Sequence, residues 1–575
     1  MRRILSSIAL LTACLGMAAC GSSSSSSNPT YLGSLSGNYV FQEQVYSYFS
    51  GATDARPPSR MTAKPLHMVK KIGGGKPLAA AFHPHSSSSH AVPAQGSVDS
   101  SIYWGAMVGA LTFDGLGDVT GGEIDYNEPL SVGYFADTAT GTYTINSDNT
   151  ATIDIISTNV GDEFYFDVAL QGIAAGSGSV AQKATLVEAE EDSLGNIEIG
   201  TGTMLASSGA SESSINGNYV FGLQGQTCYG SPCPQVYEGD LYAAGLLSAN
   251  GSGAFGGSSQ ADVSDGFGSG NLSLSGSYVA PDTMGRAAAS LSSSGDVNAG
   301  ALPAGYILYI ANSSTFFVLS TDNNNTSTGV SPYLFGTANL QSGTPSLAGN
   351  YVFAESTEDL QNENSNTPDT YSDTYLALLS ANGNTFTGTG DSNKAGVITS
   401  TVPYNYGGFT VSNLGRVSFT GSTPSGSFAP VFWLTGSGFG YGVDQLAGNA
   451  TQQEPGLIYL YAQNGSSFSA SSLSGLYAVG NLPGSTSNAG LAIGTVTSDG
   501  SSNLSGDVAL ISFGDNNVGS ATATYTVAAN GRGVATGGSG SLFGNYVFYI
   551  VSPSLSVGMD VTSGDSAPSI QTLQQ

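Results

Sequence analysis

The residues best suited to metal chemistry are the four histidines, all of which lie between residues 51 and 97. His83, His85 and His90 are close enough in sequence to offer neutral imidazoles to Zn²⁺ or Cu²⁺. The same segment is rich in Pro, Gly and Ser, a composition typical of a disordered loop. We therefore favour a loop without a specific metal over a metal site, and we expect no cofactor.

This segment also holds six of the chain's 13 Lys and Arg residues, whereas the whole chain has a net charge of −28. A surface so acidic repels nucleic acid and anionic headgroups, so no nucleic-acid partner is expected. High solubility of an exported protein is the simplest interpretation, and binding of a divalent cation or a cationic partner is the alternative. The basic segment is suited to phosphate headgroups, to anionic polysaccharide or to the protein's own acidic domains.

Three arginines recur at the same point of three similar turns, each directly after a glycine: Arg286, Arg416 and Arg532. In a chain so poor in cations, we expect each to form a bidentate pair with a nearby carboxylate. Contact with a ligand is the alternative.

The chain is rich in acids, and five lie close together: Asp114, Asp118, Glu123, Asp125 and Glu128. Carboxylates are Ca²⁺ ligands, but this spacing does not fit an EF-hand loop. We interpret the group as a hairpin turn with a solvated face. The acidic runs at 188–192 and 355–373 are predicted to be solvated loops.

Catalytic patterns are scarce. No His lies outside residues 51–97 to act as a base for a serine, and no strand–turn–helix Gly-x-Ser-x-Gly motif is present. Nothing selects two of the acids as a pair for glycoside hydrolysis. Trp104 and Trp433 could stack on sugars, although packing between strands is favoured. The sequence therefore predicts a protein that is not an enzyme.

A repeated strand signal sets the organisation of the chain. Gly-Asn-Tyr-Val-Phe opens a strand at 37–41, 217–221 and 349–353, and a weaker copy lies at 475–479. The same five residues at 544–548 lie only 69 positions after Gly475, so we interpret them as a closing strand and do not count them as a copy. Glycine marks a turn, and the aromatic and aliphatic residues that follow alternate as in a strand. The copies are more than 100 residues apart, which is the length of a small domain and not of a solenoid repeat.

Within each unit, Asn-Gly or Asp-Gly separates two alternating apolar runs, which is a strong hairpin signal. Tyr and Phe, 53 residues in total (29 and 24), supply apolar surface for real cores despite the 80 glycines. We predict an all-β chain of four tandem antiparallel domains, with small meander barrels preferred over two-sheet sandwiches. The predicted units are domain 1 at 35–208 with the insertion 51–97, domain 2 at 213–342, domain 3 at 345–465 and domain 4 at 471–575.

The N-terminus has the layout of an export signal, with Arg2 and Arg3 before an apolar run at 4–13. The small residues that end on Cys20 resemble the lipobox of bacterial lipoproteins. That resemblance implies a signal peptide at 1–19, a lipid on Cys20, a Ser-rich tether at 20–34 and an outer-membrane location. Ordinary secretion with a spare thiol is the alternative.

Two other cysteines, Cys228 and Cys233, flank a short loop with Gly and Pro, and an exported compartment favours a disulfide there. Together, the repeated strand, hairpin and Gly-Arg motifs resemble the tandem β-repeat lipoproteins abundant in acidobacterial genomes. The resemblance implies no activity. We expect a lipid-anchored surface display or interaction module with an envelope polysaccharide or protein as partner. A small-molecule or glycan-binding barrel is the alternative, and a polysaccharide-acting enzyme is the third hypothesis.

Overall fold

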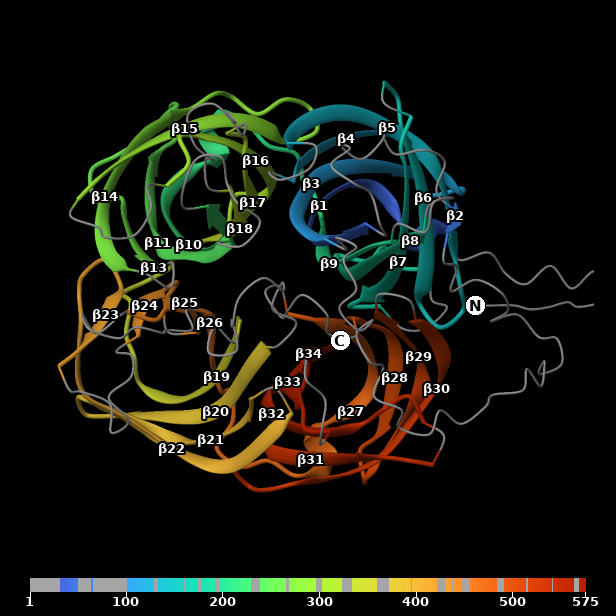
Figure 1. Cartoon of the computed structure of the whole chain (residues 1–575), viewed down its shortest axis with the longest axis vertical. Helices are drawn as coiled ribbons and strands as arrows, with labels where there is room; N and C mark the ends of the chain where they lie inside the picture. The colour runs from blue at the N-terminus through green and yellow to red at the C-terminus, as the bar shows by residue number, and fades with distance from the viewer. Residues whose placement is uncertain are drawn as a thin grey trace, which may run out of the picture. The chain divides into compact units, whose positions relative to one another are not determined.

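The computed structural model describes residues 32–575, except for 50–63, 66–100, 129–132, 160, 174–177, 192–196, 229–237, 265–267, 296–301, 323–332, 359–371, 395, 421–429, 437, 446–455, 483–490, 513–514, 540 and 563–567. The described chain forms four closed antiparallel barrels, drawn in successive colours in Figure 1. Helical structure in these ranges is limited to short 3₁₀ turns such as Leu32–Ser34. The prediction of four tandem all-β barrels is therefore confirmed.

Barrel 1 has eight strands, because β9 pairs with both β8 and β1 and so closes the sheet. The strands are β1 (Ser36–Phe49), β3 (Ser101–Asp114), β4 (Asp118–Glu128), β5 (Gly133–Ile145), β6 (Thr150–Ser157), β7 (Glu163–Gln171), β8 (Lys183–Glu191) and β9 (Ile197–Ala206). A two-residue strand, β2 (Lys64–Pro65), pairs with the outer end of β8.

Barrel 2 is closed by β18 on β10, and β12 and β13 together occupy one place between β11 and β14. Its strands are β10 (Asn216–Cys228), β11 (Glu238–Asn250), β12 (Ala254–Phe255), β13 (Gln260–Ser264), β14 (Ser269–Tyr278), β15 (Arg286–Ser294), β16 (Gly305–Asn312), β17 (Thr315–Ser320) and β18 (Tyr333–Leu340).

Barrels 3 and 4 are closed eight-stranded meanders, in which each strand pairs with the next in sequence and the last strand pairs with the first. Barrel 3 consists of β19 (Gly349–Glu358), β20 (Ser372–Asn382), β21 (Thr385–Lys394), β22 (Val397–Val411), β23 (Arg416–Phe419), β24 (Val431–Leu434), β25 (Phe439–Val443) and β26 (Gly456–Ala462). Barrel 4 consists of β27 (Ser474–Asn481), β28 (Leu491–Asp499), β29 (Asn503–Ser512), β30 (Asp515–Val527), β31 (Arg532–Gly537), β32 (Asn545–Ser552), β33 (Leu555–Asp560) and β34 (Ile570–Gln574).

The repeated motif begins the first strand of each barrel. Its glycine has a positive φ, for example 89° at Gly37 and 115° at Gly475, which favours glycine over other residues. Successive side chains then point to opposite faces. In β1, Tyr39 and Phe41 enter the core of barrel 1, whereas Val40 between them packs in a cluster with residues of barrel 2.

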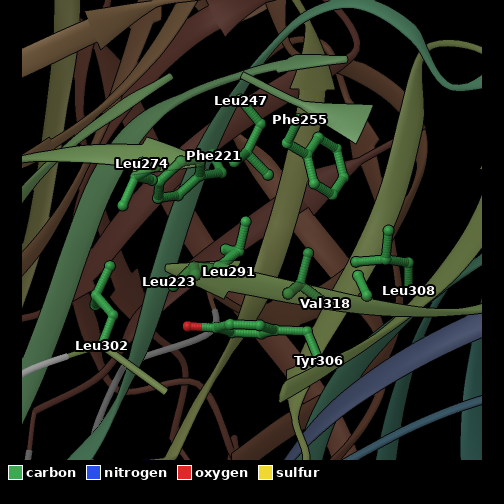
Figure 2. A pocket seen from close by; sticks show the side chains of 11 residues that line it. Phe221, Leu223, Leu247, Phe255, Leu274, Leu291, Leu302, Tyr306, Leu308 and Val318 are labelled. Atoms are coloured by element: carbon green, nitrogen blue, oxygen red, sulfur yellow. The ribbon is translucent and has the colours of Figure 1, made fainter. Parts of the chain in front are cut away.

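The interior of barrel 2 is filled by its own side chains. Phe221, Phe255 and Tyr306 are among the residues that point inward around a small cavity (Figure 2). The cavity has a volume of about 20 Å³. That is room for roughly one water molecule, and its lining is apolar.

The outward faces of the barrels meet in four apolar clusters. Each cluster joins one pair of barrels: barrels 1 and 2, barrels 2 and 3, barrels 3 and 4, and barrels 4 and 1. Every barrel therefore packs against two others, and the last barrel in sequence contacts the first.

Candidate functional sites: barrel junctions and buried carboxyl groups

At the junction of barrels 1 and 2, Arg286 binds Asp125. The Arg286 Nε and Nη2 atoms lie 2.7 and 2.8 Å from the two carboxylate oxygens. Tyr309 donates a hydrogen bond of 2.6 Å to the same carboxylate, and Tyr134 one of 2.5 Å. Asp125 is fully buried, so its charge is neutralised by an arginine of the next barrel.

The junction of barrels 2 and 3 repeats this arrangement. Arg416 Nε and Nη2 lie 2.7 and 2.6 Å from the carboxylate oxygens of buried Asp262. Trp433 Nε1 donates to Asp262 at 2.8 Å, and Gln445 Nε2 donates at 2.9 Å. Trp433 is thus fully buried as a partner of the ion pair and presents no face to a sugar.

At the junction of barrels 3 and 4, Arg532 Nε and Nη2 lie 2.9 and 2.7 Å from the oxygens of Asp391. Tyr549 lies on the strand beside Arg532, in register with it, as Tyr309 lies beside Arg286. The hydrogen bond to Asp391 raises the pKa of Arg532 above its ordinary value. Each turn arginine therefore joins its own barrel to the one before it in sequence.

The fourth junction, between barrels 4 and 1, lacks this group of residues. Thr150 pairs with Ala169 at the point of the sheet where the other barrels have arginine and an aromatic residue. In barrel 3, Asp391 on the third strand pairs with Leu376 on the second strand, which pairs with Ala354 on the first. The same steps in barrel 4, from β27 through β28 to β29, lead to Ala509. Ala169 and Ala509 both belong to the apolar cluster of this junction. All three members of the ion-pair group are thus replaced by small uncharged residues.

The segments between barrels also bind to the barrel that follows. Gln341 Nε2 donates to the carbonyl oxygens of Leu414 and Leu434, at 2.9 and 2.8 Å. Gln463 Nε2 donates in the same way to Asn530 and Ile550, at 3.0 and 2.9 Å. These linkers are fixed by specific hydrogen bonds and do not act as free tethers.

The acidic group of domain 1 is divided between a turn and the interior. Asp114 Oδ1 accepts backbone N–H groups of Leu116, Gly117 and Asp118, which lowers the pKa of Asp114 and forms the predicted hairpin turn. The prediction of a solvated face is wrong for Asp125 and Glu128, because both are buried.

The prediction of solvated acidic loops is also wrong for Glu188, Glu355 and Asp373, which are buried strand residues. In barrel 1 the backbone N–H of Glu188 donates to Glu43 Oε1 at 3.1 Å. In barrel 3, Glu355 forms a hydrogen bond with Asp444. Among the described residues, no group of three or more His, Cys, Asp or Glu is arranged to hold a metal ion.

Several predicted site residues lie outside the described residues: Cys20, Cys233, His83, His85 and His90. Cys228 is the last residue of β10, and its proposed disulfide with Cys233 stays a prediction. Trp104 is part of β3.

Neither a protein-family model nor a curated protein matches this chain. Within the described ranges, no helix has the length and apolar character needed to cross a membrane.

Proposed function

We propose that this protein is a lipid-anchored, non-enzymatic module of the bacterial cell envelope, which presents a rigid surface of β-barrels to an envelope polysaccharide or protein. The observation that carries the proposal is the repeated Arg–Asp junction, together with linkers that bind to the following barrel. Such contacts fix neighbouring barrels in one arrangement, which suits a structural or display role.

The surface available for interaction is uncharged and hydroxyl-rich on several strands. On β5 the exposed residues are Ala136 and four alternate threonines, β14 exposes Asn and Ser at alternate positions, and the described part of β30 exposes Asn, Ser and Thr together with Val518. Hydroxyl and amide groups on a regular sheet can exchange hydrogen bonds with sugar hydroxyls without attracting ions. This pattern supports a neutral polysaccharide as a partner.

One observation favours this proposal over a small-molecule-binding barrel. The cavity of about 20 Å³ in barrel 2 is far below the roughly 300 Å³ or more of a small-molecule pocket.

Expression of the full chain and of Cys20→Ala in a Gram-negative host tests the anchor. Mass spectrometry of the wild-type N-terminus is expected to find an acylated Cys20 in the outer-membrane fraction, and Cys20→Ala is expected to leave that fraction. An unmodified N-terminus in the wild type would overturn the lipid anchor.

The interaction role is tested separately with the purified chain on an array of envelope polysaccharides. Binding without release of reducing ends supports the proposal. Hydrolysis of any polysaccharide contradicts the non-enzymatic assignment.

A further inference from the structure

We propose that the junction between barrels 1 and 2 is a pH-sensitive contact, in which the carboxyl groups of Glu123 and Asp282 share one proton and the loss of that proton weakens the junction. Glu123 lies on β4 of barrel 1, and Asp282 begins the turn that precedes β15 of barrel 2. The contact lies beside the ion pair of Arg286 and Asp125 and uses different side chains.

Strand and turn geometry bring the two acids together. Glu123 lies two positions before Asp125 on β4, so both side chains point to the outer face that meets barrel 2. Asp282 Oδ1 accepts the backbone N–H groups of Met284 and Arg286, at 2.9 and 3.0 Å, within one turn. The ion pair of Arg286 with Asp125 therefore brings this turn to β4, where Asp282 forms a hydrogen bond with Glu123.

A second contact fixes the same turn on barrel 1. Thr112 Oγ1 of β3 donates to Met284 Sδ at 3.7 Å. Met284 also packs against the apolar cluster shared by barrels 1 and 2, which includes Ala110. Ala110 is in register with Glu123. The turn of barrel 2 thus lies over the part of the barrel 1 sheet that carries Glu123.

The contact between the two acids requires a proton. An ionised carboxylate only accepts hydrogen bonds, so one carboxyl group can donate to another only when it is protonated. Glu123 Oε2 is shielded from solvent and receives no hydrogen bond from the described part of the chain. Arg286 directs its Nε and Nη2 atoms to Asp125. An ionised Glu123 would therefore be a partly desolvated charge next to a second carboxylate.

The surroundings favour the protonated form of Glu123. Burial is the largest cause that raises the pKa of Glu123 from 4.5 to about 7, followed by the charge of Asp282 and the hydrogen bond to it. Arg286 opposes this shift, and Asp125 adds to it.

Two tyrosines complete the titratable groups named at this point of the junction. Tyr309 and Tyr134 donate to Asp125, and burial raises the pKa of both phenols, so they stay neutral. Glu123 is therefore the group that titrates near neutral pH. Because the folded protein binds its proton more tightly than the unfolded chain, the stability that it contributes is complete below pH 4.5 and is lost as the pH rises to about 7.

The other three junctions do not combine two acids at the equivalent positions. Strand pairing shows that the residues equivalent to Glu123 are Gln260, Thr389 and Asp507. The hydrogen bonds of the turn show that the residues equivalent to Asp282 are Ser412, Ala528 and Asn146. The chain therefore already holds Gln at one of these positions and Asn at the other, which makes Glu123→Gln and Asp282→Asn suitable variants.

The first test is urea denaturation of the full chain between pH 4.5 and about 8. Glu123→Gln mimics the protonated acid at every pH. Its urea midpoint should equal that of the wild type at the acidic end and exceed it increasingly as the pH rises to about 7. Asp118→Asn removes an exposed charge from the same strand and should leave the shape of the wild-type curve unchanged.

A difference between Glu123→Gln and the wild type that stays constant over this range would overturn the proposal. Asp167 and Asp444, whose pKa values burial raises to about 7 and about 6, titrate in both proteins and cancel in that difference. If Glu123→Gln does not fold, Asp282→Asn replaces it. This variant keeps the acceptor oxygen of the turn and should lose less stability than the wild type over the same range, and an unchanged profile would contradict proton sharing.

Met284 shows where the change occurs. Among the described methionines, Met107, Met204 and Met559 are at most 1% exposed, whereas Met284 is partly exposed at the junction. Hydrogen peroxide transfers one oxygen atom to the thioether, which yields the sulfoxide and water. Mass spectrometry should find that Met284 in the wild type is oxidised several-fold faster at the alkaline end of the range than at the acidic end, and that Glu123→Gln removes this difference. Equal rates in the wild type would overturn the proposal.

Discussion

Arg416 of barrel 3 holds both carboxylate oxygens of Asp262 in barrel 2, at 2.7 and 2.6 Å, although the two residues are 154 positions apart in sequence. Asp262 is fully buried, and the arginine that compensates the charge of its carboxylate is supplied by another domain. The folding of barrel 2 and its packing on barrel 3 are therefore coupled through one ion pair.

Removal of one partner is expected to be severe. Arg416→Ala leaves the charge of Asp262 buried and without its arginine, which should lower the free energy of unfolding by about 3–5 kcal/mol. Urea denaturation of the full chain measures this loss. Asp507→Ala, at an exposed position, should change the same quantity by no more than about 0.5 kcal/mol.

The paired replacement Asp262→Leu/Arg416→Met distinguishes a need for charge from a need for packing. Buried ion pairs can often be replaced by apolar residues with little loss. This variant should therefore be clearly more stable than Arg416→Ala alone. A double variant that is as unstable as the single one would show that the geometry of the ion pair itself is required.

The fourth junction gives the converse experiment. Ala509→Asp places a carboxylate in the apolar cluster between barrels 4 and 1, where Thr150 stands at the position of the turn arginine, and should destabilise the chain by several kcal/mol. Adding Thr150→Arg should restore part of the loss, as measured by the midpoint of thermal unfolding. If Ala509→Asp alone causes no loss, the junction is not closed in solution.

Asp444 predicts a specific pH dependence. Burial raises its pKa from 3.8 to about 6, with Glu355, Tyr404 and Tyr406 as the titratable groups around it. The folded protein thus binds this proton more tightly than the unfolded chain. The stability it contributes is complete below pH 3.8 and is lost as the pH rises through about 6.

The wild type should therefore lose stability relative to Asp444→Asn between these pH values. Urea midpoints of the two proteins, measured across this range, should converge at the acidic end. Parallel curves would show that the carboxyl group titrates normally.

Gly456 provides a steric prediction with a matched control. Gly456→Ala adds a methyl group against Thr357 and Glu355 and should cost about 1–3 kcal/mol through overpacking. Gly438 precedes the neighbouring strand, and a Cβ atom there would meet nothing within 4 Å. Gly438→Ala should therefore have little effect in the same denaturation assay.

The sequence predicted the barrels because their signals are local. A glycine with positive φ, a run of alternating aromatic and aliphatic residues and an Asn-Gly or Asp-Gly turn each act over a few residues, and each is present in all four units. The carboxylate partner of Arg416 could not be identified in this way. Asp262 lies in another barrel, so its proximity to Arg416 depends on the strand pairing and on how the two barrels pack, neither of which is a local signal.

The buried acids were partly predictable. Glu355 has the same strand parity as Tyr351 and Phe353, so its inward direction follows from period-two alternation. The prediction of a solvated loop at 355–373 overlooked that signal. Its hydrogen-bond partner Asp444 depends on the neighbour of β26, and only the closed topology shows it.

The small apolar residues between barrels 4 and 1 also bear on the order of folding. The other three junctions join consecutive barrels, so each can form as soon as the next barrel has been synthesised. Barrels 4 and 1 can meet only after barrel 4 has been synthesised. An apolar contact is non-directional and tolerates imperfect approach, whereas an Arg–Asp pair would leave a charge exposed to wrong partners throughout synthesis. Ala509 and Thr150 therefore suit the contact that forms last.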